Sequence, residues 1–152
     1  MSSSLSSEMF TAAMFYAVAQ NDETALEEAI YAGAKVDSRN GSGWTATHIA
    51  AKKGNVKLIR ILAQAQADVD IPDDNGMTPL LVAAAEGCGM ELLELLRCGA
   101  NINAQNRYGQ NAKTLAQVHG HEDVVKLLED IESAQKSEEE EKKGKEDRKS
   151  VV

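Results

Sequence analysis

The sequence predicts an all-α solenoid in which one helix–turn–helix unit occurs four times. Three observations predict it. The chain resembles itself when it is shifted by 33 residues, the last three copies have a helix cap and a turn glycine at fixed places, and apolar residues recur at helical spacing. Units of this length stack in a row, because one unit alone cannot bury its apolar face. A chain of 152 residues is long enough for one such domain.

The repeat is visible in matched positions along the chain. One shift places Thr45 on Thr78, Gly54 on Gly87 and Ala67 on Ala100, and a second shift carries Thr78 to Asn111, Gly87 to Gly120 and Leu95 to Leu128. The predicted repeats are residues 9–39, 40–72, 73–105 and 106–132, after a flexible N-terminus of residues 1–8. The outermost copies match less well, which is typical of end repeats because one of their faces meets water.

The first helix of the second, third and fourth copies has a recognisable start and end. Thr78 is predicted to cap a helix through its hydroxyl, with Pro79 at the first helical position, where no amide partner is lost. Thr45 and Asn111 occupy the same place in the neighbouring copies. Small residues keep this helix slim, and Gly54, like its equivalents in later copies, turns the chain into the second helix.

The second helix buries aliphatic residues at helical spacing, and three positions depart from the pattern. Leu95 and Leu96 are expected to lie buried between successive repeats. Gln66 replaces the glycine that ends this helix, which predicts a looser turn. Glu91 stands where an apolar residue is expected, which predicts a late start or a slight rotation. In the first copy, Asn21 falls where the turn glycine would stand.

Residues 76–87 and 95–104 closely resemble the ankyrin repeat, and residues 45–55 are a second, looser match that keeps the motif histidine, His48. The resemblance covers roughly residues 9–131. It implies β-hairpin fingers at the turn signals 40–43, 73–76 and 106–109, and an imidazole at His48 that forms hydrogen bonds within and between repeats. It also implies that the chain binds another protein.

Composition excludes several other functions. The net charge of −8 disfavours nucleic acid, whose phosphates attract basic proteins. The N-terminus lacks the features of a signal peptide, and the longest apolar-rich stretch, residues 11–19, is too short to span a membrane. Cys88 and Cys98 are too few for a disulfide framework, which suggests a reducing compartment. We therefore expect a cytoplasmic monomer, with the nucleus also possible as a location.

No residue pattern predicts an enzyme. No nucleophile has a base at motif spacing, and no glycine-rich loop follows a strand, so we expect no catalytic residue and no cofactor. His119 and His121 lack further ligands at a suitable spacing, so we expect no metal. The two cysteines are interpreted as small hydrophobic residues, and Asn103 as a structural loop residue.

The expected binding surface consists of finger tips and the ends of the first helices, which face the concave side in ankyrin repeats. The resemblance places there Arg39, Ser42, Trp44, Lys52, Lys53, Asp74, Asn75, Met77, Glu86, Arg107, Tyr108 and Gln110, with Ala85, Val118 and His119 beside them. Trp44 is either the central contact, with Met77 and Tyr108 in register, or folds back on the neighbouring finger. We expect contact, because aromatic residues are enriched at binding hot spots.

The predicted function is that of a small adaptor or scaffold, and the alternative is a stoichiometric inhibitor of a partner enzyme or transcription factor. From Ser133 the chain is rich in both charges, and this tail either extends the last helix through Glu–Lys pairs or is disordered, which we expect. Its last residues, Ser150, Val151 and Val152, resemble a C-terminal ligand of PDZ domains. The partner's identity is not encoded in any motif.

Overall fold

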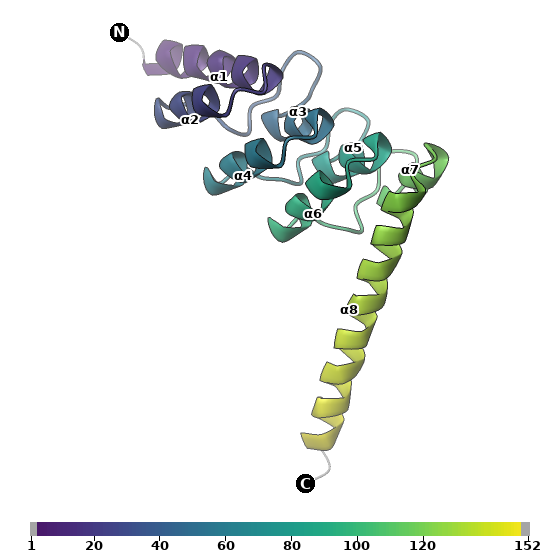
Figure 1. Cartoon of the computed structure of the whole chain (residues 1–152). Coiled ribbons are helices and arrows are strands. Elements are labelled where there is room, and N and C mark those ends of the chain that lie inside the picture. The colour runs from purple at the N-terminus through teal and green to yellow at the C-terminus, as the bar shows by residue number, and fades with distance from the viewer. Residues whose placement is uncertain (1–2, 150–152) are drawn as a thin grey trace.

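The computed structural model describes residues 3–149 and shows a row of helix pairs with one long helix at its end (Figure 1). Within this range the chain forms eight helices and no strand. The helices are α1 (Ser3–Ala19), α2 (Glu23–Tyr31), α3 (Ala46–Lys53), α4 (Val56–Gln64), α5 (Pro79–Glu86), α6 (Gly89–Arg97), α7 (Ala112–Val118) and α8 (Glu122–Lys149). The predicted all-α solenoid is confirmed.

The helices form two rows. Helix α3 packs between α1 and α5, and α5 packs on α7, while α4 packs between α2 and α6, and α6 reaches the start of α8. Each pair therefore covers the apolar face of the next one (Figure 1). This is the arrangement that the 33-residue period predicts, because every unit contacts only its neighbours.

The predicted caps set the ends of the first helices. The Thr78 hydroxyl accepts a hydrogen bond from the backbone N–H of Leu81, and Pro79 is the first residue of α5. Thr45 and Asn111 accept the equivalent N–H groups at the starts of α3 and α7. Gly87 ends α5 with a φ of 78°, which glycine adopts without steric strain.

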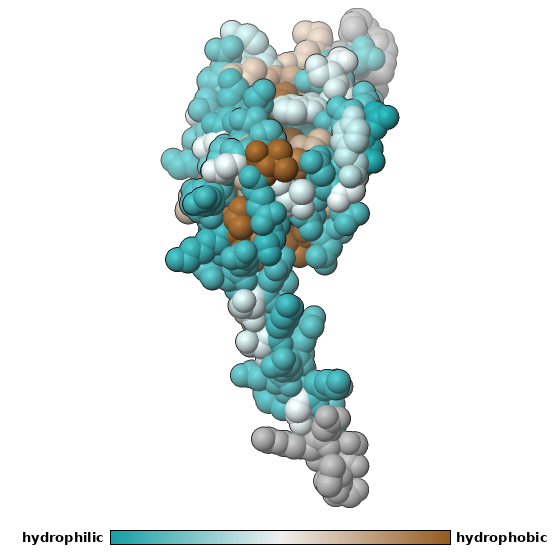
Figure 2. Space-filling view, turned by 90° about the vertical axis from the view of Figure 1, so that its right-hand side faces the viewer, coloured by the Kyte–Doolittle hydropathy of each residue, from teal (hydrophilic) through white to brown (hydrophobic). Residues whose placement is uncertain are grey.

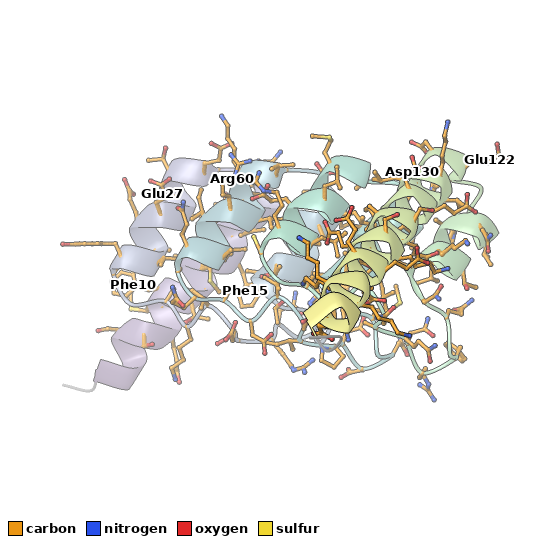
Figure 3. The ribbon with its side chains drawn as sticks, turned by 90° about the horizontal axis from the view of Figure 1, so that it is seen from below. Phe10, Phe15, Glu27, Arg60, Glu122 and Asp130 are labelled. Atoms are coloured by element: carbon orange, nitrogen blue, oxygen red, sulfur yellow. The ribbon has the colours of Figure 1, made fainter. Side chains whose placement is uncertain are left out.

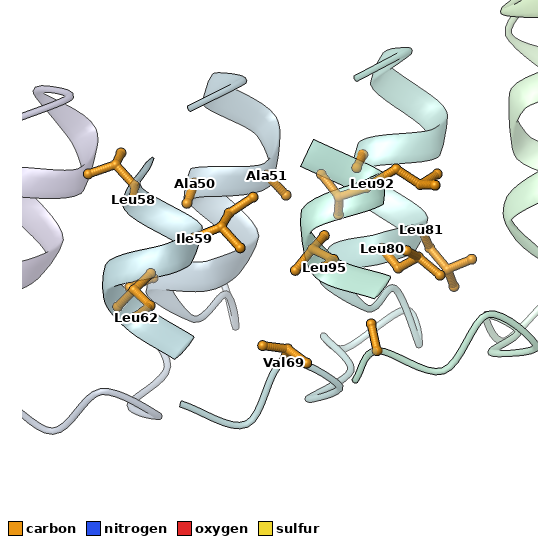
Figure 4. Packing of buried hydrophobic residues seen from close by; sticks show 14 of the residues in the cluster. Ala50, Ala51, Leu58, Ile59, Leu62, Val69, Leu80, Leu81, Leu92 and Leu95 are labelled. Atoms are coloured by element: carbon orange, nitrogen blue, oxygen red, sulfur yellow. The ribbon is translucent and has the colours of Figure 1, made fainter. Parts of the chain in front are cut away.

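The core lies between the two rows (Figure 4). Small residues such as Ala50 and Ala83 are completely buried in the first helices, so that neighbouring helices approach closely. Leu62 and its equivalent Leu95 are buried in the second helices, as predicted. Leu96 is only half-buried, so the expectation of full burial was wrong for this residue. It packs against the core as a partly buried side chain.

Two local predictions of irregular geometry were also wrong. Gln66 adopts the left-handed conformation with a φ of 67°, and Ala67 N–H donates to Leu62 O at 3.1 Å, as Ala100 N–H donates to Leu95 O at 3.0 Å beside Gly99. The turn after α4 is therefore as tight as its glycine-containing equivalent, because the hydrogen bonds and packing impose the conformation.

Helix α6 also keeps the regular register. It begins at Gly89, two residues after Gly87, just as α4 begins two residues after its turn glycine. Leu92 and Leu95 are completely buried at the places where Ile59 and Leu62 are buried in α4. Glu91 is itself buried, so the helix starts neither late nor rotated.

The fingers are tight turns without strands among residues 3–149. Each turn is closed by two backbone hydrogen bonds. In the first finger Asn40 N–H donates to Trp44 O at 2.8 Å and Gly43 N–H donates to Asn40 O at 3.0 Å. The second finger has the same two bonds, formed by the N–H groups of Asp73 and Gly76, and the third has them from Asn106 and Gly109. The expected hairpins are present as turns, but they are too short to continue as a ladder.

Both ends of the chain are more helical than expected. Helix α1 begins at Ser3, so residues 3–8 belong to a helix and not to a flexible segment. The hydroxyl of Ser7 donates to Gly33 O, and that of Thr11 accepts from the Lys35 N–H, so this extension is tied to the loop after α2. Helix α8 continues through residues 133–149 and projects from the stack (Figure 1). Residues 150–152, the PDZ-like ending, lie outside the described residues.

Candidate interaction surface

The three fingers are held side by side by hydrogen bonds between neighbouring turns. Trp44 Nε1–H donates to Asp73 Oδ2 at 2.8 Å, which links the first finger to the second. The backbone N–H of Arg107 donates to Asn75 O at 3.0 Å and links the second to the third. A Cβ added at Gly76 would lie 2.8 Å from the Arg107 nitrogen, so only glycine permits this approach. The finger tips therefore form one fixed row.

Trp44 folds back on its neighbours. Its ring stacks on His48 with 5.5 Å between ring centroids, and the Lys52 ammonium lies 5.7 Å from the ring centroid. The side chain is half-buried and packs against the edge of the core. These contacts, with the bond to Asp73, correspond to the second interpretation of Trp44 from the sequence. Trp44 thus stabilises the finger row, and only part of its surface remains open.

Tyr108 is the exposed aromatic residue of the row. Its side chain is 71% exposed, and the Arg107 guanidinium carbon lies 5.5 Å from its ring centroid. Met77, in contrast, is half-buried, and its sulfur lies 3.6 Å from Asn106 Nδ2. The three residues in register at the tips therefore differ in role, because Trp44 and Met77 pack against the protein and Tyr108 faces outward.

The other predicted contact residues are distributed along the same surface. Exposed members are Arg39, Ser42, Lys52, Lys53, Asp74, Asn75, Glu86 and Arg107, and Gln110 is half-buried. Arg39 donates to Gly43 O at 3.1 Å and to Pro72 O. Gln110 accepts from Asn106 Nδ2 at 2.9 Å. The contact between Lys52 and Trp44 shows that the end of α3 and the first finger form one surface.

His48 joins two repeats, as the resemblance implies. Its Nδ1 accepts from the Thr45 backbone N–H at 3.1 Å, and its Nε2 lies 2.7 Å from Met77 O. Because a carbonyl only accepts, the proton is on Nε2 and the ring is neutral. Burial lowers the pKa of His48 from its ordinary value of 6.5, although the bond to Met77 opposes the shift. The residue is structural and has no free nitrogen for chemistry.

The remaining titratable candidates have structural surroundings. His121 Nε2 lies 2.9 Å from Ala85 O, and its ring stacks against His119. Cys88 and Cys98 flank α6 as half-buried free thiols, and burial raises the pKa of both. Residues 3–149 contain no group of three or more His, Cys, Asp or Glu side chains that could hold a metal ion.

A second surface was missed by the sequence analysis. On the outer side of the first helix pair, a furrow is lined by Phe10, Ala13, Tyr16, Ala25, Glu28 and Ala29. The sequence does contain a sign of this furrow, because the 33-residue shift places Ala25 and Ala29 on Leu58 and Leu62, two completely buried leucines. The smaller alanine side chains leave a hollow, which a comparison of residue sizes between the repeats can predict.

The stacked helix pairs, cross-repeat histidine and row of turns define a class of protein, the repeat solenoids that present a rigid surface. A family model for ankyrin repeats (three copies) matches residues 14–106, and the chain therefore belongs to the ankyrin-repeat family. Ankyrin repeats are protein–protein interaction modules and are generally not catalytic. None of the helices in residues 3–149 has the length and apolar character needed to cross a bilayer.

The chain is similar to parts of several larger proteins. It is 34% identical over 100 residues to human ankyrin repeat domain-containing protein 63, a match covering 63% of this chain and 26% of that protein. It is 36% identical over 94 residues to mouse protein phosphatase 1 regulatory subunit 12A, covering 62% and 9%. A putative palmitoyltransferase, ZDHHC13 of Danio rerio, is 28% identical over 126 residues, covering 82% and 20%. The aligned parts span about a quarter or less of these relatives.

Proposed function

We propose that this chain acts as a small adaptor or scaffold that binds another protein through its finger tips and concave face. The observation that carries the proposal is the exposed pair of Tyr108 and Arg107, held on a finger that is bonded to its neighbour. A tyrosine in a fixed position can bury a large area against a partner at little entropic cost. Tyrosine and arginine are also enriched among the residues that dominate binding energy.

Charged residues on the surface can orient the partner. Arg39, Lys52 and Lys53 are exposed cations of the repeat that carries Trp44, with Lys52 over the Trp44 ring. Two carboxylates lie at the same finger, because Asp73 accepts from Trp44 Nε1–H and Asp74 lies beside Gly43. On a chain of net charge −8, the three cations would attract an acidic patch of the partner. We expect these charges to set the partner's orientation and association rate more than its affinity.

The projecting part of α8 supports an adaptor over an inhibitor. An adaptor needs two usable surfaces, and residues 133–146 are exposed along a helix that extends well beyond the stack (Figure 2). An inhibitor needs only the finger row. A chain ending before Ser133 distinguishes the two, because an adaptor loses one of its partners and an inhibitor keeps its single one. Thermal melting of the shortened chain provides the control for folding.

The test of the proposed surface is affinity capture with single variants. We expect Tyr108→Ala and Arg107→Ala to reduce the captured partner at unchanged melting temperature, because both side chains are exposed. The matched control is Tyr31→Ala, which removes a tyrosine that is 95% exposed at the end of α2. Equal loss with all three variants, or loss with the control alone, would place the binding surface elsewhere.

A further inference from the structure

The furrow at the first helix pair lies on the side of α1 and α2 that faces away from α3 and α4. Its lining is mainly apolar, and Glu28 is its one charged residue. Figure 3 shows Phe10 and Glu27 at this end of the stack, with Glu122 and Asp130 of α8 at the opposite end. Phe10 and Tyr16 contribute the aromatic side chains of the lining, and Ala25 and Ala29 the small ones. The furrow is thus remote from the C-terminal helix.

Repeat equivalence shows what kind of face this is. Under the 33-residue shift, Ala13, Ala25 and Ala29 correspond to Ala46, Leu58 and Leu62, all completely buried in the second repeat. Equivalent positions point the same way in each repeat, so these are the positions that face a preceding unit. The first repeat therefore presents a stacking face, with alanines in place of two leucines.

The opposite end of the stack is finished differently. A hollow on α7 and α8 is lined mainly by polar groups, namely Gln117, Gly120, Glu122, Val125, Lys126 and Glu129. Figure 2, which looks at this end, shows mostly hydrophilic surface with small separate hydrophobic patches. Terminal repeats of a solenoid need a polar outer face for solubility. The C-terminal end of the described stack has such a face, and the furrow at the other end has a more apolar lining.

Glu28 indicates the charge that the occupant carries. Its equivalent two repeats later, 66 residues along the chain, is Glu94. Glu94 accepts hydrogen bonds from Arg60 of the preceding repeat, with Nε at 3.2 Å and the second guanidinium nitrogen at 3.3 Å. The Glu94 side chain is 7% exposed, and the bond from Arg60 lowers its pKa. Within residues 3–149, Glu28 forms no ion pair.

We propose that this furrow is a docking site for an amphipathic helix of a partner protein, which places an arginine against Glu28 and a leucine-sized side chain over Ala25 and Ala29. The docked helix continues the interface already formed between α4 and α6. Two copies of this chain meeting symmetrically at their furrows would bring two Glu28 carboxylates together, which disfavours self-association. The site is separate from the finger row, so it goes beyond the proposed function.

The probe for this site is a synthetic peptide with the sequence of residues 55–66, which contains α4 and its capping residue. A covalent link between the side chains that replace Leu58 and Leu62 keeps the peptide helical. In the protein these two positions face the preceding repeat, on the side of the helix opposite Arg60. We expect the full-length protein to bind the peptide in a fluorescence titration. Glu28→Gln should weaken binding about fivefold, the effect of about 1 kcal/mol for one partly exposed ion pair.

Matched variants make the result specific. Ala25→Leu fills the hollow with the residue of the second repeat and should also weaken binding, whereas Glu27→Gln, which removes a neighbouring carboxylate outside the furrow, should not change it. Glu28→Arg should abolish binding, and a peptide carrying Arg60→Glu should restore it. Glu28 is exposed, so this swap tests the site even if Ala25→Leu lowers stability.

Three outcomes would overturn the proposal. The first is no binding of the peptide to the unaltered protein. The second is binding that is indifferent to both Glu28 and Ala25. The third is concentration-dependent dimerisation in sedimentation experiments that Glu28→Arg removes, which would assign the furrow to a second copy. None of these outcomes affects the finger row, whose test uses Tyr108 and Arg107.

Discussion

The Nε2 atom of His48 lies 2.7 Å from the backbone carbonyl oxygen of Met77, in the following repeat. The same ring accepts the Thr45 backbone N–H on its other nitrogen and faces the Thr45 hydroxyl at 2.8 Å. One imidazole thereby closes the start of α3 and ties it to the next finger. Because Nδ1 must accept and Nε2 must donate, the bonds require a neutral ring.

This arrangement predicts a specific dependence of stability on pH. The pKa of His48 is lowered in the folded state, so near pH 6 the unfolded chain binds a proton that the folded chain does not. The free energy of unfolding should fall as the pH decreases from about 7 through the unfolded pKa of about 6.5. We expect His48→Gln to be less stable at pH 7 but to lose less stability between pH 7 and 5. The free energy of unfolding of both proteins is measured in urea at each pH. If the unaltered protein and His48→Gln lose the same amount between pH 7 and 5, His48 does not cause the pH dependence.

Leu95 and Leu96 provide a matched pair in the core of the third repeat. Leu95 is completely buried, and Leu96 is half-buried. Leu95→Ala should lower the free energy of unfolding by about 2–5 kcal/mol, because it leaves a cavity that the neighbouring helices cannot fill. Leu96→Ala should cost clearly less. Chemical denaturation of both variants measures the difference, and equal losses would mean that the packing between α4 and α6 has been misassigned.

Gln66 should be replaceable with a gain in stability. Its φ of 67° lies in the left-handed region, where a residue with a Cβ is strained by about 1–2 kcal/mol. Gln66→Gly relieves this strain, and part of the gain is offset by the greater entropy of the unfolded chain. We expect a net stabilisation of about 0.5–1 kcal/mol. Gln64→Gly, within the helix, is the control and should destabilise. A loss of stability with Gln66→Gly would show that its side chain contributes more than its backbone costs.

Trp44 should be a stability residue as well as part of the surface. Trp44→Ala removes the bond to Asp73 and the stacking on His48, so we expect a loss of about 1–3 kcal/mol in the free energy of unfolding. Trp44→Phe keeps an aromatic ring but no N–H donor, and should lose less. Thermal melting distinguishes the two contributions. If Trp44→Ala melts like the unaltered protein, the fold-back contacts do not persist in solution.

The repeat period, caps and core helices could be predicted because each depends on residues close in sequence. Thr78, Pro79 and Gly87 specify the ends of α5 through local backbone chemistry, and the shift of 33 residues repeats that information. Gln66 and Glu91 were misjudged, since the stack imposes a regular geometry on residues that do not favour it. For Trp44, both interpretations followed from the sequence, and only the distance to Asp73 distinguishes them.

The two chain ends were harder to predict for a different reason. Residues 3–8 have little apolar content, and their helical structure is linked to a bond between Ser7 and the distant Gly33. The tail offered helix and disorder as alternatives, and pairs such as Glu138 with Lys142 are compatible with the helix that the structure contains. The furrow depends on Ala25 and Ala29, whose small size matters only when their equivalents are known to be buried leucines.

Site-specific photo-crosslinking in cell lysate can show whether a partner contacts the finger row. A photoreactive phenylalanine derivative replaces Tyr108 in one protein and Tyr31 in another, both positions being highly exposed. If the partner binds the finger row, position 108 gives a discrete crosslinked partner band and position 31 gives none. Crosslinking from position 31 with none from position 108 would contradict recognition through the finger row.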